Sequence, residues 1–326
     1  MTGAEYAARQ PAQRVPLGRA APGRDAAMAM PGSPMVRRRR LAAELRSIRE
    51  SSGKSGDNVA AALRWSPSKI SRYELARTGL KVPEVEKLLD YYQITGARRA
   101  QLLELARDAA QKAWWEDYTA ELSADYRQYI GFEHEASSIA IWHVEVVPGL
   151  LQTEAYARDI IANYGVIEPI APGMIERLVR IRMQRQQVLT REPPVELSVV
   201  LDESCLRRRI GDERVMYDQL MYLADLAGHP NIAIRILPLD ARHAVLGPAF
   251  VVFHFGSFSE AILHDVVASE QLKNVYTVES EQETHLHRLV FQSLVSASLD
   301  AEASAALIRE TAESCWSIGR ADALTN

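Results

Sequence analysis

The segment from Ser55 to Thr78 constrains the fold of this 326-residue chain most strongly, because two short helices and a tight turn can be derived from it. Ser55 is a residue type that caps the start of a helix. Ser66 can cap a second helix that begins at Pro67, where proline is tolerated because the first N–H groups of a helix have no intrahelical partner. The sequence therefore predicts a helix, a turn and a second helix that ends near Leu75.

The two faces of this second helix differ when its residues are placed at about 100° intervals. Ile70, Tyr73 and Glu74 cluster on the side that can pack on neighbouring helices. A helix that reads the major groove of DNA needs such a packed back and a polar front near its N-terminus. Arg and Lys pair with guanine, and Ser donates or accepts at several base edges. We expect base contacts from the four residues on or beside the front: Ser68, Lys69, Ser71 and Arg72.

Polar and cationic residues around the segment are expected to hold the DNA backbone, which is recognised largely through phosphate contacts. These residues are Arg46, Ser55, Arg64, Ser66 and Arg77. The alternative interpretation is an ordinary capped helix at the surface. We prefer the DNA-binding interpretation because capping, helical spacing and local charge agree.

Charge is distributed unevenly along the chain. Between Met35 and Thr95, thirteen Lys and Arg stand against seven Asp and Glu, a net charge of +6, whereas the whole chain carries −4, so the remainder sums to −10. A basic module joined to an acidic remainder is what phosphate contacts predict. The arginines at 37–40 stand at a predicted helix start, where cations oppose the helix dipole. We interpret them as contacts to DNA phosphate in preference to a solvated run.

Composition divides the chain into three parts. Residues 1–35 are rich in Ala, Pro, Gly and Arg, which predicts a disordered arm. Apolar spacing predicts five helices over 36–113, an all-α helix-turn-helix domain. Residues 114–326 form the third part, a larger regulatory or interaction domain.

The larger part mixes helical and strand-like patterns. Helices are expected at about 115–124, 139–164, 174–190, 212–228, 281–299 and 301–316, and strands at about 195–201, 231–237, 250–255, 261–267 and 275–278. Helices followed by strands without regular βα alternation predict an α+β domain with a mainly antiparallel sheet.

Several classes of function are disfavoured. Cys205 and Cys315 are isolated, so a disulfide framework or zinc site is not expected, and a reducing compartment suits them. No apolar stretch approaches the length of a membrane span or the core of a signal peptide. GxGxxG, GxxxxGK[ST], GxSxG and HExxH motifs do not occur. We therefore expect a cytoplasmic, nucleoid-associated protein that is no enzyme and needs no cofactor, catalytic residue or metal.

Two clusters leave alternatives open. Trp114, Trp115 and Tyr118 either line a ligand pocket or form core where domains pack, and we prefer core. The arginines at 207–209 either bind an anion or partner or belong to a solvated loop, and we prefer the loop.

Residues 37–92 resemble the Xre/Cro-type helix-turn-helix family, most closely at SPSKISRYE. The remainder resembles the C-terminal domain of an actinobacterial group of such regulators, described as Scr/WhiJ-like or antitoxin-like. The segments that carry this second resemblance are WWEDY at 114–118, VPGLLQTEAYAR at 147–158, the helix at 177–189, ESCLRRRIGD at 203–212 and NIAIRILPL at 231–239. The resemblance implies developmental or antibiotic-related transcription control, often alongside a small partner protein encoded nearby.

Two positions depart from the family pattern. Gly56 stands where the first helix of the motif usually carries Gln, which helps to fix the protein on the DNA backbone. Arg64 stands where the turn usually has Gly, and a side chain in that left-handed conformation costs about 1 kcal/mol. Both departures concern the strength of DNA binding more than the fold.

The sequence predicts a transcription regulator that binds double-stranded DNA as a homodimer, because dimers read paired half-sites about one helical turn apart. The larger domain is then expected to mediate dimerisation or sensing. The alternative is an antitoxin-like or adaptor protein that binds a small partner protein and uses its DNA-binding module for autoregulation. A third possibility is a ligand sensor with a pocket near Trp114 and Trp115.

Overall fold

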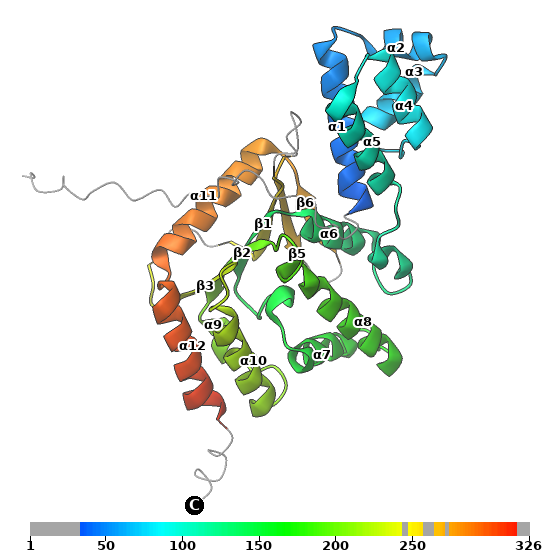
Figure 1. Cartoon of the computed structure of the whole chain (residues 1–326). Coiled ribbons are helices and arrows are strands. Elements are labelled where there is room, and N and C mark those ends of the chain that lie inside the picture. The colour runs from blue at the N-terminus through cyan, green and yellow to red at the C-terminus, as the bar shows by residue number, and fades with distance from the viewer. Residues whose placement is uncertain (1–32, 243–246, 257–263, 271–273, 318–326) are drawn as a thin grey trace, which may run out of the picture.

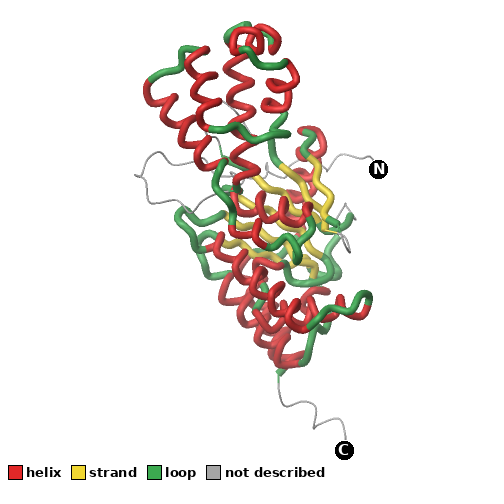
Figure 2. The backbone as a smooth tube through the Cα atoms, turned by 90° about the vertical axis from the view of Figure 1, so that its right-hand side faces the viewer, coloured by secondary structure: helices red, strands yellow, loops and turns green. Residues whose placement is uncertain are grey.

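The computed structural model describes residues 33–242, 247–256, 264–270 and 274–317. Nearly all of the arm predicted over 1–35 lies outside the described residues. Figure 1 shows a small helical module above a larger domain built on a sheet, and Figure 2 shows the same two parts from the side. None of the described helices combines the length and apolar character needed to cross a bilayer.

Five helices make the small module: α1 (Pro34–Ser51), α2 (Gly56–Leu63), α3 (Pro67–Glu74), α4 (Val82–Tyr91) and α5 (Gly96–Ala109). Their apolar stripes meet in one core that includes Leu41, Leu45, Val59, Ile70, Val85, Leu89 and Leu102. The five-helix module expected from the sequence is confirmed.

The larger domain is built on a six-stranded sheet with the strand order β3-β2-β1-β4-β5-β6. The strands are β1 (Ser138–His143), β2 (Glu196–Asp202), β3 (Ile232–Leu237), β4 (Phe250–His254), β5 (Val266–Glu270) and β6 (Val275–Val278). The β1–β4, β4–β5 and β5–β6 pairs are antiparallel, so the expected α+β domain with a mainly antiparallel sheet is confirmed. The β1–β2 and β2–β3 pairs are parallel, because helical crossovers join these strands.

Helices cover both faces of the sheet. The helices of the larger domain are α6 (Ala124–Glu135), α7 (Glu154–Asn163), α8 (Pro172–Arg185), α9 (Ser204–Arg207), α10 (Glu213–Leu226), α11 (Glu281–Ala297) and α12 (Ala301–Trp316), with short 3-10 turns η1 (Trp114–Asp117), η2 (Gly149–Leu151), η3 (Tyr164–Val166) and η4 (Gln186–Leu189). One face shares a core with α6, α10 and α12. The opposite face packs on Phe291 and Leu294 of α11.

The prediction of a helix over 139–164 is wrong at its start, because the chain there forms β1 near the centre of the sheet. Ile139 and Ile141 belong to one core, whereas Trp142 belongs to the core on the opposite face. A strand buried on both faces gives a continuous apolar run, which periodicity alone does not distinguish from a buried helix.

The helix expected over 115–124 is also misplaced. Only the short turn η1 forms there, and α6 begins at Ala124 behind the cap Ser123. The buried side of α6 includes Glu133 and His134. Polar residues on a buried side break the apolar stripe from which a helix is recognised, and this hid α6 in the sequence.

Helix α1 belongs to both parts of the protein. Val36 in its first turn is buried in the core of the larger domain, whereas Leu41, Leu45 and Ile48 belong to the core of the small module. At its N-terminus the Ser33 cap lies so close to α6 that a Cβ added at Gly131 would come within 2.7 Å of the Ser33 hydroxyl oxygen. A single continuous helix therefore joins the two cores.

Candidate DNA-binding surface

The turn between α2 and α3 has the geometry of a helix-turn-helix motif. Ser55 caps α2 and forms a reciprocal capping box with Asn58. Arg64 ends α2 in the left-handed region, with φ 56° and ψ 40°. Ser66 then accepts a hydrogen bond of 3.2 Å from the Lys69 N–H. Both caps and the left-handed turn lie where the sequence predicts them.

The back of α3 is fixed by apolar packing and one hydrogen bond. Ile70 and Tyr73 are buried in the small core. The Tyr73 hydroxyl donates to Glu84 of α4 over 3.0 Å. The ring of Trp65 meets that of Tyr73 edge-on at 5.9 Å. These contacts set which face of α3 points away from the protein.

An ion pair between α1 and α3 fixes the end of the helix. Arg49 Nε donates to Glu74 Oε1 over 2.6 Å, and Arg49 Nη2 donates to Glu74 Oε2 over 3.0 Å. Hydrogen bonding to Glu74 raises the pKa of Arg49. The sequence does not reveal this pair, because two residues 25 positions apart on different helices leave no pattern along the chain.

Lys69 points back toward the module in this structure. Its Nζ lies 2.8 Å from Glu84 Oε1 and 4.2 Å from the centroid of the Trp65 ring. The hydrogen bond to Glu84 raises the pKa of Lys69, so the ammonium stays charged. The base contact expected of Lys69 stays a prediction and requires release from Glu84.

The outer face of α3 is exposed. Ser68, Ser71 and Arg72 are exposed along the helix. Arg64 and Arg77 are exposed at the turns before and after it. In Figure 1, α2 and α3 lie at the end of the molecule away from the sheet. The described part of the larger domain therefore leaves this face open to a ligand as large as DNA.

The remaining predicted backbone contacts surround this face. Arg46 is half exposed and pairs with Glu50, four residues along α1, at 2.9 Å. Ser55 and Ser66 are exposed, and their hydroxyls are used as helix caps. An exposed ion pair of this kind contributes little, so Arg46 is available for exchange to a phosphate.

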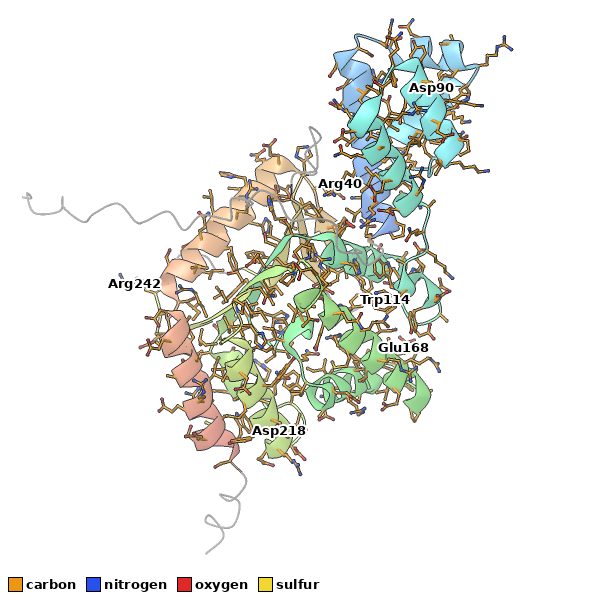
Figure 3. All side chains as sticks on the ribbon, in the orientation of Figure 1. Arg40, Asp90, Trp114, Glu168, Asp218 and Arg242 are labelled. Atoms are coloured by element: carbon orange, nitrogen blue, oxygen red, sulfur yellow. The ribbon has the colours of Figure 1, made fainter. Side chains whose placement is uncertain are left out.

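Three of the arginines at 37–40, Arg37, Arg39 and Arg40, contact the larger domain, and their interpretation as phosphate contacts needs correction. Arg37 Nε donates to Glu135 over 2.9 Å, and its Nη1 donates to Asp108. Arg39 pairs with Glu279, and Arg40 Nη2 donates to the Gly256 carbonyl over 3.4 Å. Figure 3 labels Arg40 at this junction. Carboxylates of the protein itself thus neutralise Arg37 and Arg39 at the start of α1.

The aromatic cluster lies in the link between the two parts. Trp115 is buried with Ala113, Leu122, Ile130 and Ile181. Trp114 meets Trp115 edge-on at 5.5 Å and Tyr118 at 6.0 Å, and Figure 3 labels Trp114 beside α6 and α8. A recess lined by Trp114, Glu133 and Arg185 has room for about one water molecule. The geometry is that of packed core.

The arginines at 207–209 are exposed. Arg207 pairs with Glu203 at 2.8 Å, and Arg209 pairs with Glu213 at 2.9 Å. Such pairs between neighbouring residues are typical of a solvated surface, which agrees with the preferred interpretation.

Comparison with known proteins assigns both parts of the chain. Residues 40–102 match a helix-turn-helix domain, and the match includes α2, the turn and α3. A helix-turn-helix domain indicates DNA binding. No curated protein matches the chain. Residues 126–310 match a domain of unknown function, DUF5753, from α6 to α12. Because this match covers more than half of the 326 residues, the chain belongs to the DUF5753 family.

Proposed function

We propose that this protein is a sequence-specific transcription regulator that places α3 in the major groove of DNA. The observation that carries the proposal is the exposed face of Ser68, Ser71 and Arg72 between two exposed arginines, Arg64 and Arg77. An eight-residue helix is about 12 Å long, close to the width of the major groove. The two arginines then stand beside the phosphates at either end of the helix. We assign the chain no catalytic role, cofactor or metal.

We propose that the protein acts as a homodimer of the Xre/Cro type, in the actinobacterial Scr/WhiJ-like group, with the larger domain responsible for dimerisation or sensing. One α3 helix presents few side chains to the bases, and paired half-sites about one helical turn apart supply the missing specificity. A dimer that binds a palindromic site would support this arrangement.

The test uses the full chain and duplexes selected from a random-sequence pool. Arg72→Ala should cost about 1–3 kcal/mol of binding free energy and relax the preference at one position of each half-site. Arg214→Ala, on the exposed surface of α10, is the matched control and should change neither. Affinity should also fall with salt, with a log–log slope near −0.9 per phosphate neutralised. A parent protein that selects no sequence contradicts the proposal.

An adaptor that binds a small partner protein is the second candidate, favoured by exposed apolar side chains in the α7–α8 turn. Tyr164, Val166 and Ile167 are 46%, 88% and 59% exposed. Exposed apolar clusters often mark interaction sites. Light scattering of the parent and of a Val166→Ser/Ile167→Ser variant separates the two candidates. If the parent is a dimer and the variant is a monomer, the turn mediates self-association. A parent that is monomeric at all concentrations and on DNA favours the adaptor that binds a small partner protein.

A further inference from the structure

Leu75, the C-cap residue of α3, is a large apolar residue that is exposed to solvent. The residue is 51% exposed, and the other exposed large apolar residues among those that the structure describes belong to the larger domain. Leu75 is not part of the core of the small module, to which α3 contributes Ile70 and Tyr73.

The position of Leu75 aligns it with the predicted reading face. Leu75 follows Ser68 by seven residues, about two helical turns, so both lie on the same side of α3, with Ser71 and Arg72 between them. Its N–H donates to the Ser71 carbonyl over 3.0 Å, so Leu75 closes the last turn of α3 as its C-cap, with φ −92° and ψ 6°. The chain turns away at Ala76, which has φ 53°. Leu75 is therefore held in line with the side chains expected to contact bases.

The major groove offers an apolar side chain one kind of complementary group. Base edges there carry hydrogen-bond donors and acceptors, and the apolar group is the C5-methyl of thymine. The C5-methyl of 5-methylcytosine has the same place on the ring. A leucine pressed on a polar edge would remove that edge from water without replacing its hydrogen bonds, which is unfavourable. We propose that Leu75 makes α3 select a pyrimidine that carries a methyl group at C5.

This inference rests on the proposed function, and its test changes a single methyl group of the DNA. In the duplex selected by the full chain, each thymine is replaced in turn by deoxyuridine, which lacks only that methyl. Burial of one methyl group corresponds to a factor of about four in affinity. We expect a loss of about fourfold at one thymine of each half-site and smaller losses elsewhere.

Two protein variants identify the residue that reads the methyl. Leu75→Ala should bind the thymine and deoxyuridine duplexes almost equally. Leu286→Ala is the matched control, because Leu286 is 52% exposed on α11, and it should keep the parent's preference. At the same position of the duplex, 5-methylcytosine should bind the parent about fourfold more tightly than cytosine.

The outcomes separate this inference from the proposed function. Sequence-selective binding in which no deoxyuridine has an effect, or in which the parent and Leu75→Ala respond alike, overturns the inference alone. A selected DNA site that contains no thymine also overturns the inference alone. A protein that selects no duplex overturns both.

Discussion

Arg49 of α1 and Glu74 of α3 face each other through two parallel hydrogen bonds, and both side chains are about 15% exposed. This pair connects the helix that spans both cores with the helix proposed to read DNA. Removing one partner of a hydrogen-bonded pair of charged groups costs about 1.5–3 kcal/mol. The orientation of α3 should therefore depend on this pair.

We expect the Arg49→Ala and Glu74→Ala variants each to lower the free energy of unfolding by about 2 kcal/mol, and the double variant to lose less than the sum. DNA affinity should fall with either single change, because α3 loses its fixed angle. Urea denaturation and binding to a selected duplex measure the two effects. The same cycle at Arg214 and Asp218, an exposed pair, should give a coupling below about 1 kcal/mol. Additive losses at 49 and 74 would contradict the assignment.

Arg64, the left-handed residue at the turn, should affect the stability of the protein and its DNA affinity in opposite directions. Replacing Arg64 by Gly relieves a conformation unfavourable to side chains, at some cost in unfolded-chain entropy, and should raise the free energy of unfolding by about 0.5–1 kcal/mol. DNA affinity should fall, since the proposed phosphate contact is lost. Ala76→Gly is the matched control with φ 53°, and it should give a similar gain in stability without weakening DNA binding. Equal affinities for the parent and Arg64→Gly would remove Arg64 from the interface.

The junction between the two parts should loosen when Arg37 is replaced by Ala. Arg37 connects α1 to Glu135 of α6 and to Asp108 of α5, and its side chain is 17% exposed. We expect faster amide hydrogen exchange over residues 34–40 and a broader distribution of dimensions in small-angle scattering. Arg158→Ala removes a guanidinium that also bridges two carboxylates but is more exposed, and it should change neither. Unchanged exchange in Arg37→Ala would show that apolar packing alone holds the junction.

His134 should make the protein less stable in mild acid. Burial lowers the pKa of His134 to about 4, with the nearby Arg191 and Arg37 acting in the same direction. Between the ordinary pKa near 6.5 and this value, the unfolded chain binds a proton that the folded chain does not. Stability should therefore decrease as the pH falls from 6.5 to 4, by an amount on the order of 3 kcal/mol.

Denaturation at pH 7 and pH 4.5 tests the role of His134. In His134→Phe the aromatic contact with Trp115 can be kept while the titrating group is lost, so this variant should lose less stability on acidification than the parent. His285→Phe, at an exposed position of α11, should behave like the parent. An identical pH dependence in all three proteins would assign the acid effect to other groups.

The sequence predicts the helix-turn-helix segment well because its signals are local. Ser66 and Pro67 fix the start of α3, and the spacing of Ile70 and Tyr73 fixes its buried side. The strands β2, β3, β4 and β6 were also predictable from apolar, β-branched runs. The mixed pairing of the sheet was not, because it depends on how the crossovers place β1 between β2 and β4.

The partners of the charged residues were the least predictable part of the site. Arg37 and Lys69 have the residue types expected at a DNA interface, but Glu135 and Glu84 lie within reach of them only after folding. A sequence shows which side chains carry charge. It does not show which of them form ion pairs with residues of other helices in the folded protein. Arg72 and Arg64 remain exposed in the folded chain, so the prediction now depends mainly on them.

Because Val36 lies in one core while Leu41 lies in the other, no single cut yields two intact fragments. A fragment that starts at residue 114 lacks Val36 and the Ser33 cap, so it uncovers the part of α6 around Gly131 and Phe132 and should be prone to aggregation. A fragment that ends at residue 113 keeps α1, but the first turn of this helix is then no longer buried against the larger domain. Dissection of this protein by truncation would therefore report damage to α1 as loss of function, and point substitutions are the sounder tool.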